Sequence, residues 1–305
     1  MKIIQATIDH VTNIRNILYE RDKYPYTDTE IERLAFGFDI DKGLCFLVLQ
    51  DDRTVGIALF EKRFLSQKGL DSQHWLYWEN LYVSVNHRNG LAYAKIVRTV
   101  KDYSKANKFE GIYCAVHRPE VVQLHNKFGF DVSPAFKINF DRFRIRFFSQ
   151  TYKSGLNRWV EVIEKDRGIT RKLKLLSKQL ENYQDSSSLW VNWTEQGLER
   201  RLVSRKRSIR TFFMLSDGAC RIVRLYKILP FLRVAFELGE RVGNTSHDSF
   251  YPFSGITVFF KTVHPSDRSI ASRLFCLRQY DLVLWRRDCK TLSEITFSLL
   301  DHDAI

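Results

Sequence analysis

The chain has 305 residues, of which 44% are hydrophobic and 27% are charged, and its net charge is +13. These proportions are typical of a folded globular protein and exclude a disordered or fibrous chain, while the length favours two domains over one. Residues 1–150 hold 22 Lys and Arg against 18 Asp and Glu, whereas residues 151–305 hold 26 against 17. A basic second half suits a nucleic acid, an acidic protein partner or a solvated surface.

The cysteines and the apolar runs indicate in which cellular compartment the protein is expected. The five cysteines include no C-x-x-C pair, and neither they nor the histidines have the spacing of metal ligands. Most of these cysteines lie in apolar runs, which favours buried thiols in a reducing compartment. No secretion signal, no run long enough to cross a bilayer and no strongly amphipathic basic helix is visible. We therefore expect a cytoplasmic protein without membrane contact.

The first half begins with alternating strand and helix patterns. A strand at 3–6 is followed by a helix after Asp9, and a short helix at 28–35 has Asp28 or Thr29 as its expected cap. Two strands, 44–50 and 54–63, flank a polar turn and predict a hairpin.

The stretch 79–96, ENLYVSVNHRNGLAYAKI, joins a strand to a helix through a glycine turn. In the strand, Leu81, Val83 and Val85 should share one face, with Tyr82 and Ser84 on the other. The first amides of the helix have no partner within it, and together with the helix dipole they form an anion site suited to phosphate.

The rest of this half continues the alternation. The apolar run 111–116 predicts a buried parallel strand, a helix begins at Pro119, and 136–148 alternates as a long strand with a basic face. The expected order is therefore β-α-α-β-β-β-α-β-α-β.

Two motifs resemble those of the GCN5-related N-acetyltransferases, the GNAT superfamily. The first is the family's Arg/Gln-x-x-Gly-x-Gly/Ala loop, which fits here with either His87 or, preferably, Arg88 in first place. The second is Leu124-His125-Asn126-Lys127-Phe128-Gly129-Phe130, which is similar to the family's Leu-Tyr-x-Lys-x-Gly-Phe. The resemblance covers about residues 1–148. It implies an α/β fold with a mixed central sheet flanked by helices, and acetyl-CoA or another acyl-CoA as co-substrate.

The resemblance also implies site residues. Glu79 is the expected general base, and His125 stands where the family has its tyrosine general acid. The acyl-CoA would lie along the strand and the helix start, and the residues implied for its binding are Leu81, Val83, Val85, Arg88, Asn89, Gly90, Leu91 and Ala92.

The second half has the pattern of a degenerate copy of the first. Residues 194–228 repeat the helix, strand, turn and strand of residues 29–62. The strand that opens 255–274 runs into Val263-His264-Pro265-Ser266-Asp267-Arg268, which resembles the approach to the cofactor loop, and 281–285 falls where the next buried strand should. No glycine follows Arg268, so the active site is expected in the first domain. The predicted domains are 1–150, which binds acyl-CoA, and 151–305, with the boundary near 149–157.

The function implied by the resemblance is acyl transfer, most simply of acetyl, from a coenzyme A thioester to a primary amine by direct attack. The amine acceptor, a small molecule or a protein, is not specified by the sequence, and nucleic acid is a further partner through the basic half. The alternative is a GNAT-fold binding module of weak catalytic power that holds nucleic acid or an acidic protein.

Overall fold

The computed structural model describes residues 1–37, 43–67, 71–88, 90–146, 159–162, 168–182, 188–202, 208–216, 219–238, 255–263, 276–288 and 294–295. The chain forms two compact units, one of residues 1–133 with 282–294 and one of residues 134–281 with 295–305. The expected boundary at 149–157 lies outside the described residues. In the described part of the chain, no helix is long and apolar enough to cross a membrane.

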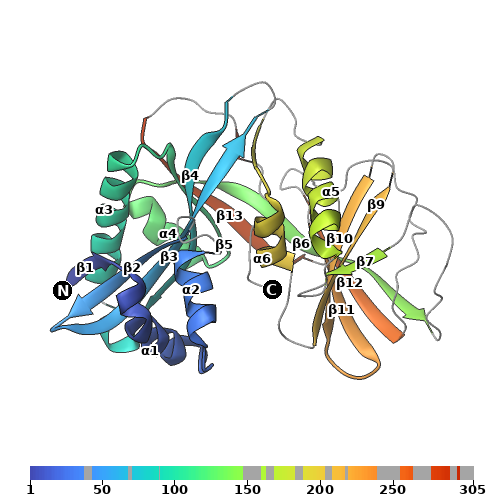
Figure 1. The fold of residues 1–305 in the computed structure, drawn as a ribbon, viewed down its shortest axis with the longest axis horizontal. Helices are drawn as coiled ribbons and strands as arrows, with labels where there is room; N and C mark the ends of the chain where they lie inside the picture. Colours follow the sequence, from blue (N-terminus) through green and yellow to red (C-terminus); the bar gives the residue numbers. More distant parts are fainter. Residues whose placement is uncertain are drawn as a thin grey trace. The chain divides into compact units, whose positions relative to one another are not determined.

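The first unit has the predicted order of elements (Figure 1). They are β1 (Lys2–Gln5), the 3-10 turn η1 (Ile8–His10), α1 (Val11–Asp22), α2 (Asp28–Phe36), β2 (Gly43–Gln50), β3 (Arg53–Ser66), β4 (Gln73–Val83), the 3-10 turn η2 (Val85–His87), α3 (Leu91–Ala106), β5 (Gly111–Val116), α4 (Pro119–Lys127) and the start of β6 (Asp131–Arg146), most of which belongs to the second unit. One boundary differs from the expectation. Strand β4 ends at Val83, so Val85 lies in η2 and not on the strand face with Leu81.

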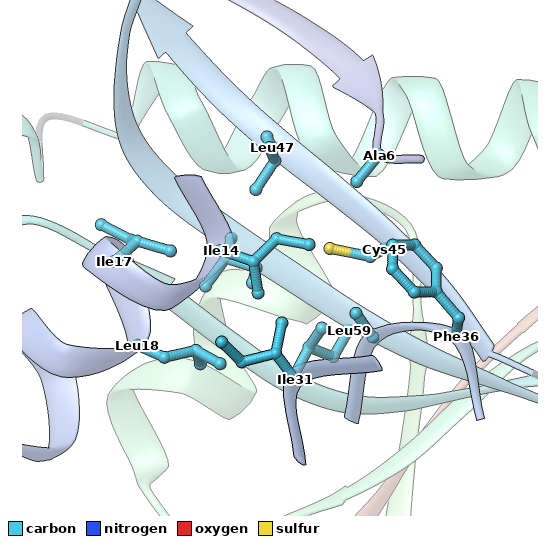
Figure 2. Packing of buried hydrophobic residues seen from close by; sticks show 11 residues of the cluster. Ala6, Ile14, Ile17, Leu18, Ile31, Phe36, Cys45, Leu47 and Leu59 are labelled. Carbon is cyan, nitrogen blue, oxygen red and sulfur yellow. The ribbon is translucent and has the colours of Figure 1, made fainter. Parts of the chain in front are cut away.

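The sheet of the first unit runs β1-β2-β3-β4-β5-β13. Strands β1 to β4 pair antiparallel, and β4 and β5 pair parallel. On one face, Cys45, Leu47 and Leu59 pack against α1 and α2 in a core cluster (Figure 2). On the other face, the alternate residues Phe46 and Phe60 turn toward α3, where Phe46 contacts Tyr103. The period-two alternation of β2 and β3 therefore places helices on both faces.

Two local features show how the helices begin and end, and one of them corrects the expected N-cap of α2. The N-cap of α2 is Thr27, not Asp28 or Thr29, because the Thr27 hydroxyl accepts from the Glu30 amide at 3.3 Å while the Glu30 carboxylate accepts from the Thr27 amide at 2.8 Å. Helix α4 starts at Pro119 and is followed by Gly129, whose φ is +72°, before the buried Phe130 leads into β6. The predicted role of that glycine as a helix terminator is confirmed.

The last strand of the first unit's sheet comes from the end of the chain. Strand β13 (Cys276–Arg286) lies next to β5, and its residues Leu282, Val283 and Leu284 are buried. Beyond it, the Arg287 amide donates to the Glu110 carbonyl at 2.9 Å. The strand predicted at 281–285 is confirmed, but it completes the first unit and does not take the place of β5 in the second.

The second unit contains a pattern of pairings that repeats that of the first. Its further elements are β7 (Trp159–Val162), α5 (Ile169–Asn182), β8 (Ser188–Val191), α6 (Glu195–Leu202), β9 (Ile209–Ser216), β10 (Ala219–Lys227), β11 (Leu232–Leu238), β12 (Gly255–Val263) and β14 (Glu294–Ile295). The predicted helix and hairpin are confirmed as α6, β9 and β10. Strands β11 and β12 pair parallel, as β4 and β5 do, so β11 and not β12 takes the place of the cofactor-approach strand. The expected loop and helix at 264–274 lie outside the described residues.

Candidate active site

The central strands of the first unit separate where the sequence predicts the site. Parallel pairing of β4 with β5 ends at Tyr77 and Tyr113, although β4 continues to Val83 and β5 to Val116. The strands therefore share hydrogen bonds at one end only. Such an opening in a parallel pair offers unpaired strand edge to an extended ligand, which can bind as an added strand.

Glu79 lies at a β-bulge just beyond this opening. Leu59 pairs with Asn80 and Phe60 pairs with Trp78, so Glu79 is the extra residue on β4. A bulge turns the strand and interrupts the regular ladder, which is how a backbone amide can be aimed at a ligand. The half-buried Glu79 is thus placed beside a backbone feature of the kind that can stabilise an oxyanion.

The start of α3 has a glycine at its N-cap. Gly90 is its N-cap with φ of +79°, in the left-handed region, and a Cβ built there would meet no atom within 4 Å. The helix start thus has open space beside Gly90, and the first-turn amides of a helix have no partner within the helix. Arg88 stands beside this start, where its Nε donates to the Val83 carbonyl at 2.7 Å and its guanidinium lies 5.5 Å from the centre of the Tyr82 ring.

Helix α1 fixes the end of β4 through a carboxylate. Tyr82 Oη donates to Glu20 Oε1 at 2.9 Å, and Ser84 Oγ donates to Glu20 Oε2 at 3.0 Å. Both side chains turn toward α1, as the predicted alternation requires. The hydrogen bond to Glu20, with burial as the larger cause, raises the pKa of Tyr82.

His125 is buried in an aromatic cage and bonded to Tyr93. Its Nδ1 lies 2.7 Å from Tyr93 Oη, and only 4% of the residue is exposed. Trp78 stacks on Tyr93 and meets His125 edge-on, with Phe130 on a further side. Burial lowers the pKa of His125 to about 4 and raises that of Tyr93. The imidazole is therefore neutral at pH 7.

A second polar cluster lies at the point where β4 and β5 part. Arg63 Nε donates to Glu61 Oε2 at 2.9 Å, and its Nη1 donates to Tyr113 Oη at 3.2 Å. The guanidinium also lies 3.7 Å from the centre of the Tyr77 ring. Sequence reasoning missed this ion pair, because charged residues in an alternating strand usually lie on its solvated face. No local signal distinguishes a buried pair from that case.

The predicted site residues occupy one continuous stretch of β4, η2 and α3, with His125 on α4. Leu81 and Val83 are half-buried on β4, Val85 is 68% exposed, Leu91 is 49% exposed, and Ala92 is buried. Asn89 lies outside the described residues. Among the described residues, no group of His, Cys, Asp and Glu is arranged to hold a metal ion.

Comparisons with known proteins agree with this geometry. The profile of the Acetyltransferase (GNAT) family matches residues 11–130. A GCN5-related N-acetyltransferase from Anabaena variabilis has a similar fold, with a TM-score of 0.61 at 9% identity over 94% of this chain and 73% of that one. A tandem GNAT protein from the clavulanic acid biosynthesis pathway gives a TM-score of 0.52 at 9% identity over 95% of this chain and 99% of that one.

No curated protein matches the sequence. At such identities the structural likeness shows the fold alone, and the family assignment rests on the profile and on the motifs at Arg88–Gly90 and Leu124–Phe130. Residues 11–130 therefore match the acetyltransferase (GNAT) family, within a fold similar to that of a tandem GNAT protein.

Proposed function

We propose that the protein is an acyl-CoA-dependent N-acyltransferase, with acetyl as the acyl group and a primary amine as the acceptor, and that it works in the cytoplasm. The observation that carries the proposal is the combination of a parallel pair that opens at Tyr77, a bulge at Glu79 and an uncapped helix start at Gly90, all along one strand-to-helix path. A pantetheine arm fits the opening as an added strand, and its pyrophosphate fits the amides of α3.

The proposed reaction is direct attack of a neutral amine on the thioester carbonyl. Glu79, directly or through a water, takes the proton of the attacking nitrogen as the C–N bond forms. A backbone amide at the bulge stabilises the tetrahedral oxyanion, and collapse breaks the C–S bond. The products are the amide and the coenzyme A thiolate, which takes up one proton from solvent while Glu79 releases to solvent the proton that it took from the amine.

His125 enters the proposal as a hydrogen-bond donor to the leaving sulfur. An imidazole with a pKa of about 4 is a poor source of imidazolium at pH 7, so a full proton transfer from His125 is disfavoured. The arrangement in which Tyr93 donates to Nδ1 leaves the ring proton on Nε2, which can then donate a hydrogen bond. The sequence position of His125 suggests a general acid that gives up a proton, whereas the buried neutral imidazole donates only a hydrogen bond.

The test is calorimetric titration of acetyl-CoA into the wild type and a Gly90→Trp variant. A Cβ at Gly90 would meet no protein atom, so the indole should block the start of α3, at the cost of backbone strain from a φ of +79°. Micromolar binding by the wild type, on the order of −8 kcal/mol, should be lost in the variant. Gly129→Asn is the matched control, because it places a side chain at another left-handed glycine and should bind normally. A wild type that does not bind acetyl-CoA would overturn the proposal.

A further inference from the structure

The turn between β10 and β11 exposes three large apolar side chains in four residues. Ile228, Leu229 and Phe231 are 57%, 46% and 59% exposed, and Pro230 between them is also exposed. Isolated exposed apolar residues are common on proteins, but a contiguous group of them marks a surface that binds something. We name residues 228–231 the apolar turn.

Backbone hydrogen bonds hold the apolar turn in one conformation. The Ile228 and Leu229 amides both donate to the Leu232 carbonyl, at 3.0 and 3.1 Å, and the Leu232 amide donates to the Leu229 carbonyl at 3.2 Å. The Phe231 carbonyl accepts from the Ile256 amide at 2.8 Å, which ties the turn to β12. The side chains are thus presented by a fixed hairpin end, so binding through them needs little ordering of the backbone.

The apolar surface continues from the turn along one face of the sheet. Leu232 pairs with Ile256, and Ile256 pairs with Ile145, which is 55% exposed. Directly paired residues point to the same face, so these three side chains form a row across β11, β12 and β6.

The opposite face at this end of the sheet is cationic. Arg233 and Arg144 both pair with Thr257, so they share that face, and Lys227 pairs with Arg233 at the base of the hairpin. Burial, and secondly the nearby Arg210, lowers the pKa of Arg233. The Nη1 of Arg233 is buried and has no hydrogen-bond partner among the described residues, so the exposed Lys227 is the more accessible of these two cations.

We propose that this end of the second unit docks on an anionic phospholipid membrane. The apolar turn enters the boundary between headgroups and acyl chains, while Arg233 and Lys227 contact lipid phosphates. A hairpin end that projects its apolar side chains from a turn suits insertion, whereas a protein partner would need a complementary pocket for it. Membranes facing the cytoplasm carry the required negative charge. Sequence reasoning expected no membrane contact because it looked for an amphipathic helix, and a hairpin end has no helical periodicity.

The test is sedimentation of the full-length protein with vesicles of phosphatidylcholine alone or with about a third phosphatidylserine. The wild type should sediment with the anionic vesicles and much less with the neutral ones. A Leu229→Ser/Phe231→Ser variant should lower the partition coefficient about tenfold or more, and Arg233→Gln should lower it less, since apolar insertion and charge both contribute. Leu229 and Phe231 are exposed and Arg233 is half-buried, so amide hydrogen exchange of β9 and β10 serves as the check that the second unit is intact in each variant.

Leu175→Ser is the matched control. Leu175 is 54% exposed on α5, whose sequence is also basic, so this variant removes an exposed leucine beside cations elsewhere in the same unit. It should bind vesicles as the wild type does. Loss of binding in Leu175→Ser alone, or a wild type that binds an RNA oligonucleotide but neither vesicle, would overturn the proposal.

Discussion

The two units pair their strands in the same way but differ at the one strand on which the proposed acyl transfer depends. In the first unit β2, β3 and β4 pair antiparallel and β4 then pairs parallel with β5, and in the second unit β9, β10, β11 and β12 repeat this pattern. Strand β4 carries a bulge at Glu79, whereas β11 pairs with β10 from Arg233 to Leu238 without a register shift among the paired residues. Apolar alternation is enough to keep the pairings, while the proposed chemistry needs the bulge.

The two units also resemble each other in the helix that precedes each hairpin. Thr27 caps α2 and Thr194 stands before α6, and the residues four and eight positions after each threonine are buried. These are Ile31 and Ala35 in the first unit and Leu198 and Leu202 in the second. The structure thus aligns Thr27 with Thr194, two residues away from the match of Thr29 with Thr194 that the sequence suggests.

The largest expected effect comes from the buried ion pair of the first unit. Arg63→Met leaves the Glu61 carboxylate buried without its cation, so we expect the free energy of unfolding of this unit to fall by about 3–5 kcal/mol. Amide hydrogen exchange of β3 and β4 measures this loss for the unit itself.

The second unit supplies the comparison for that experiment. Arg210 pairs with Glu161, but its side chain is 51% exposed, so Arg210→Met should cost no more than about 1 kcal/mol in the exchange of β9 and β10. Equal losses in the two variants would show that the Glu61–Arg63 pair adds nothing beyond an ordinary surface contact.

The Glu61–Arg63 pair is also an example of a feature that could not be predicted from the sequence. The order of elements in the first half was predictable because each has a local pattern, such as Pro119 at a helix start and Gly129 at a helix end. The burial of Glu61 and Arg63 depends on what covers the strand, and the bulge at Glu79 depends on register with β3. The place of β13 beside β5 is a pairing over more than 160 positions, as the contact of Arg287 with Glu110 illustrates. No local pattern encodes such a choice of partner.

The second prediction concerns the pH dependence of the first unit. An unfolded chain protonates His125 near pH 6.5, whereas the folded unit takes up that proton only near pH 4, because burial lowers the pKa. The stabilisation is therefore present above pH 6.5 and is lost as the pH falls toward 4, by up to about 3 kcal/mol. The difference in unfolding midpoint between wild type and His125→Gln, followed from pH 7 to pH 4, measures it.

In that series the variant should lose less stability on acidification than the wild type, and the carboxylates common to both cancel. If the two curves run parallel, the imidazole titrates normally in the folded unit. Burial of the ring would then have no consequence for its protonation.

The third prediction tests whether the strand from the chain's end supports the first unit. A Cβ at Gly111 would lie 2.2 Å from the Trp285 carbonyl oxygen and 2.5 Å from Trp75 Cζ3, so Gly111→Ala must shift backbone. We expect a cost of about 1–3 kcal/mol and faster hydrogen exchange in residues 282–288. In Gly197→Ala on α6 the Cβ would come within 3.3 Å of Thr194 Oγ1, but the gain in helix propensity offsets this contact. The stability of Gly197→Ala should therefore be close to that of the wild type. If hydrogen exchange at 282–288 is unchanged in Gly111→Ala, β13 does not stabilise the first unit.

The fourth prediction has the smallest expected effect and concerns whether Thr27 and Thr194 stabilise the starts of their helices equally. The Thr27 hydroxyl accepts from the Glu30 amide, and the Thr194 hydroxyl accepts from the Gly197 amide at 3.1 Å. Replacing either threonine with alanine leaves a first-turn amide without its cap, which costs about 1 kcal/mol. Thr27 also takes part in a reciprocal bond with the Glu30 carboxylate, so Thr27→Ala should cost slightly more in α2 than Thr194→Ala costs in α6. Exchange rates of the two helices in the two variants give both values, and a cost confined to Thr27→Ala would mean that the repeat preserves the shape of the helix start without its energetics.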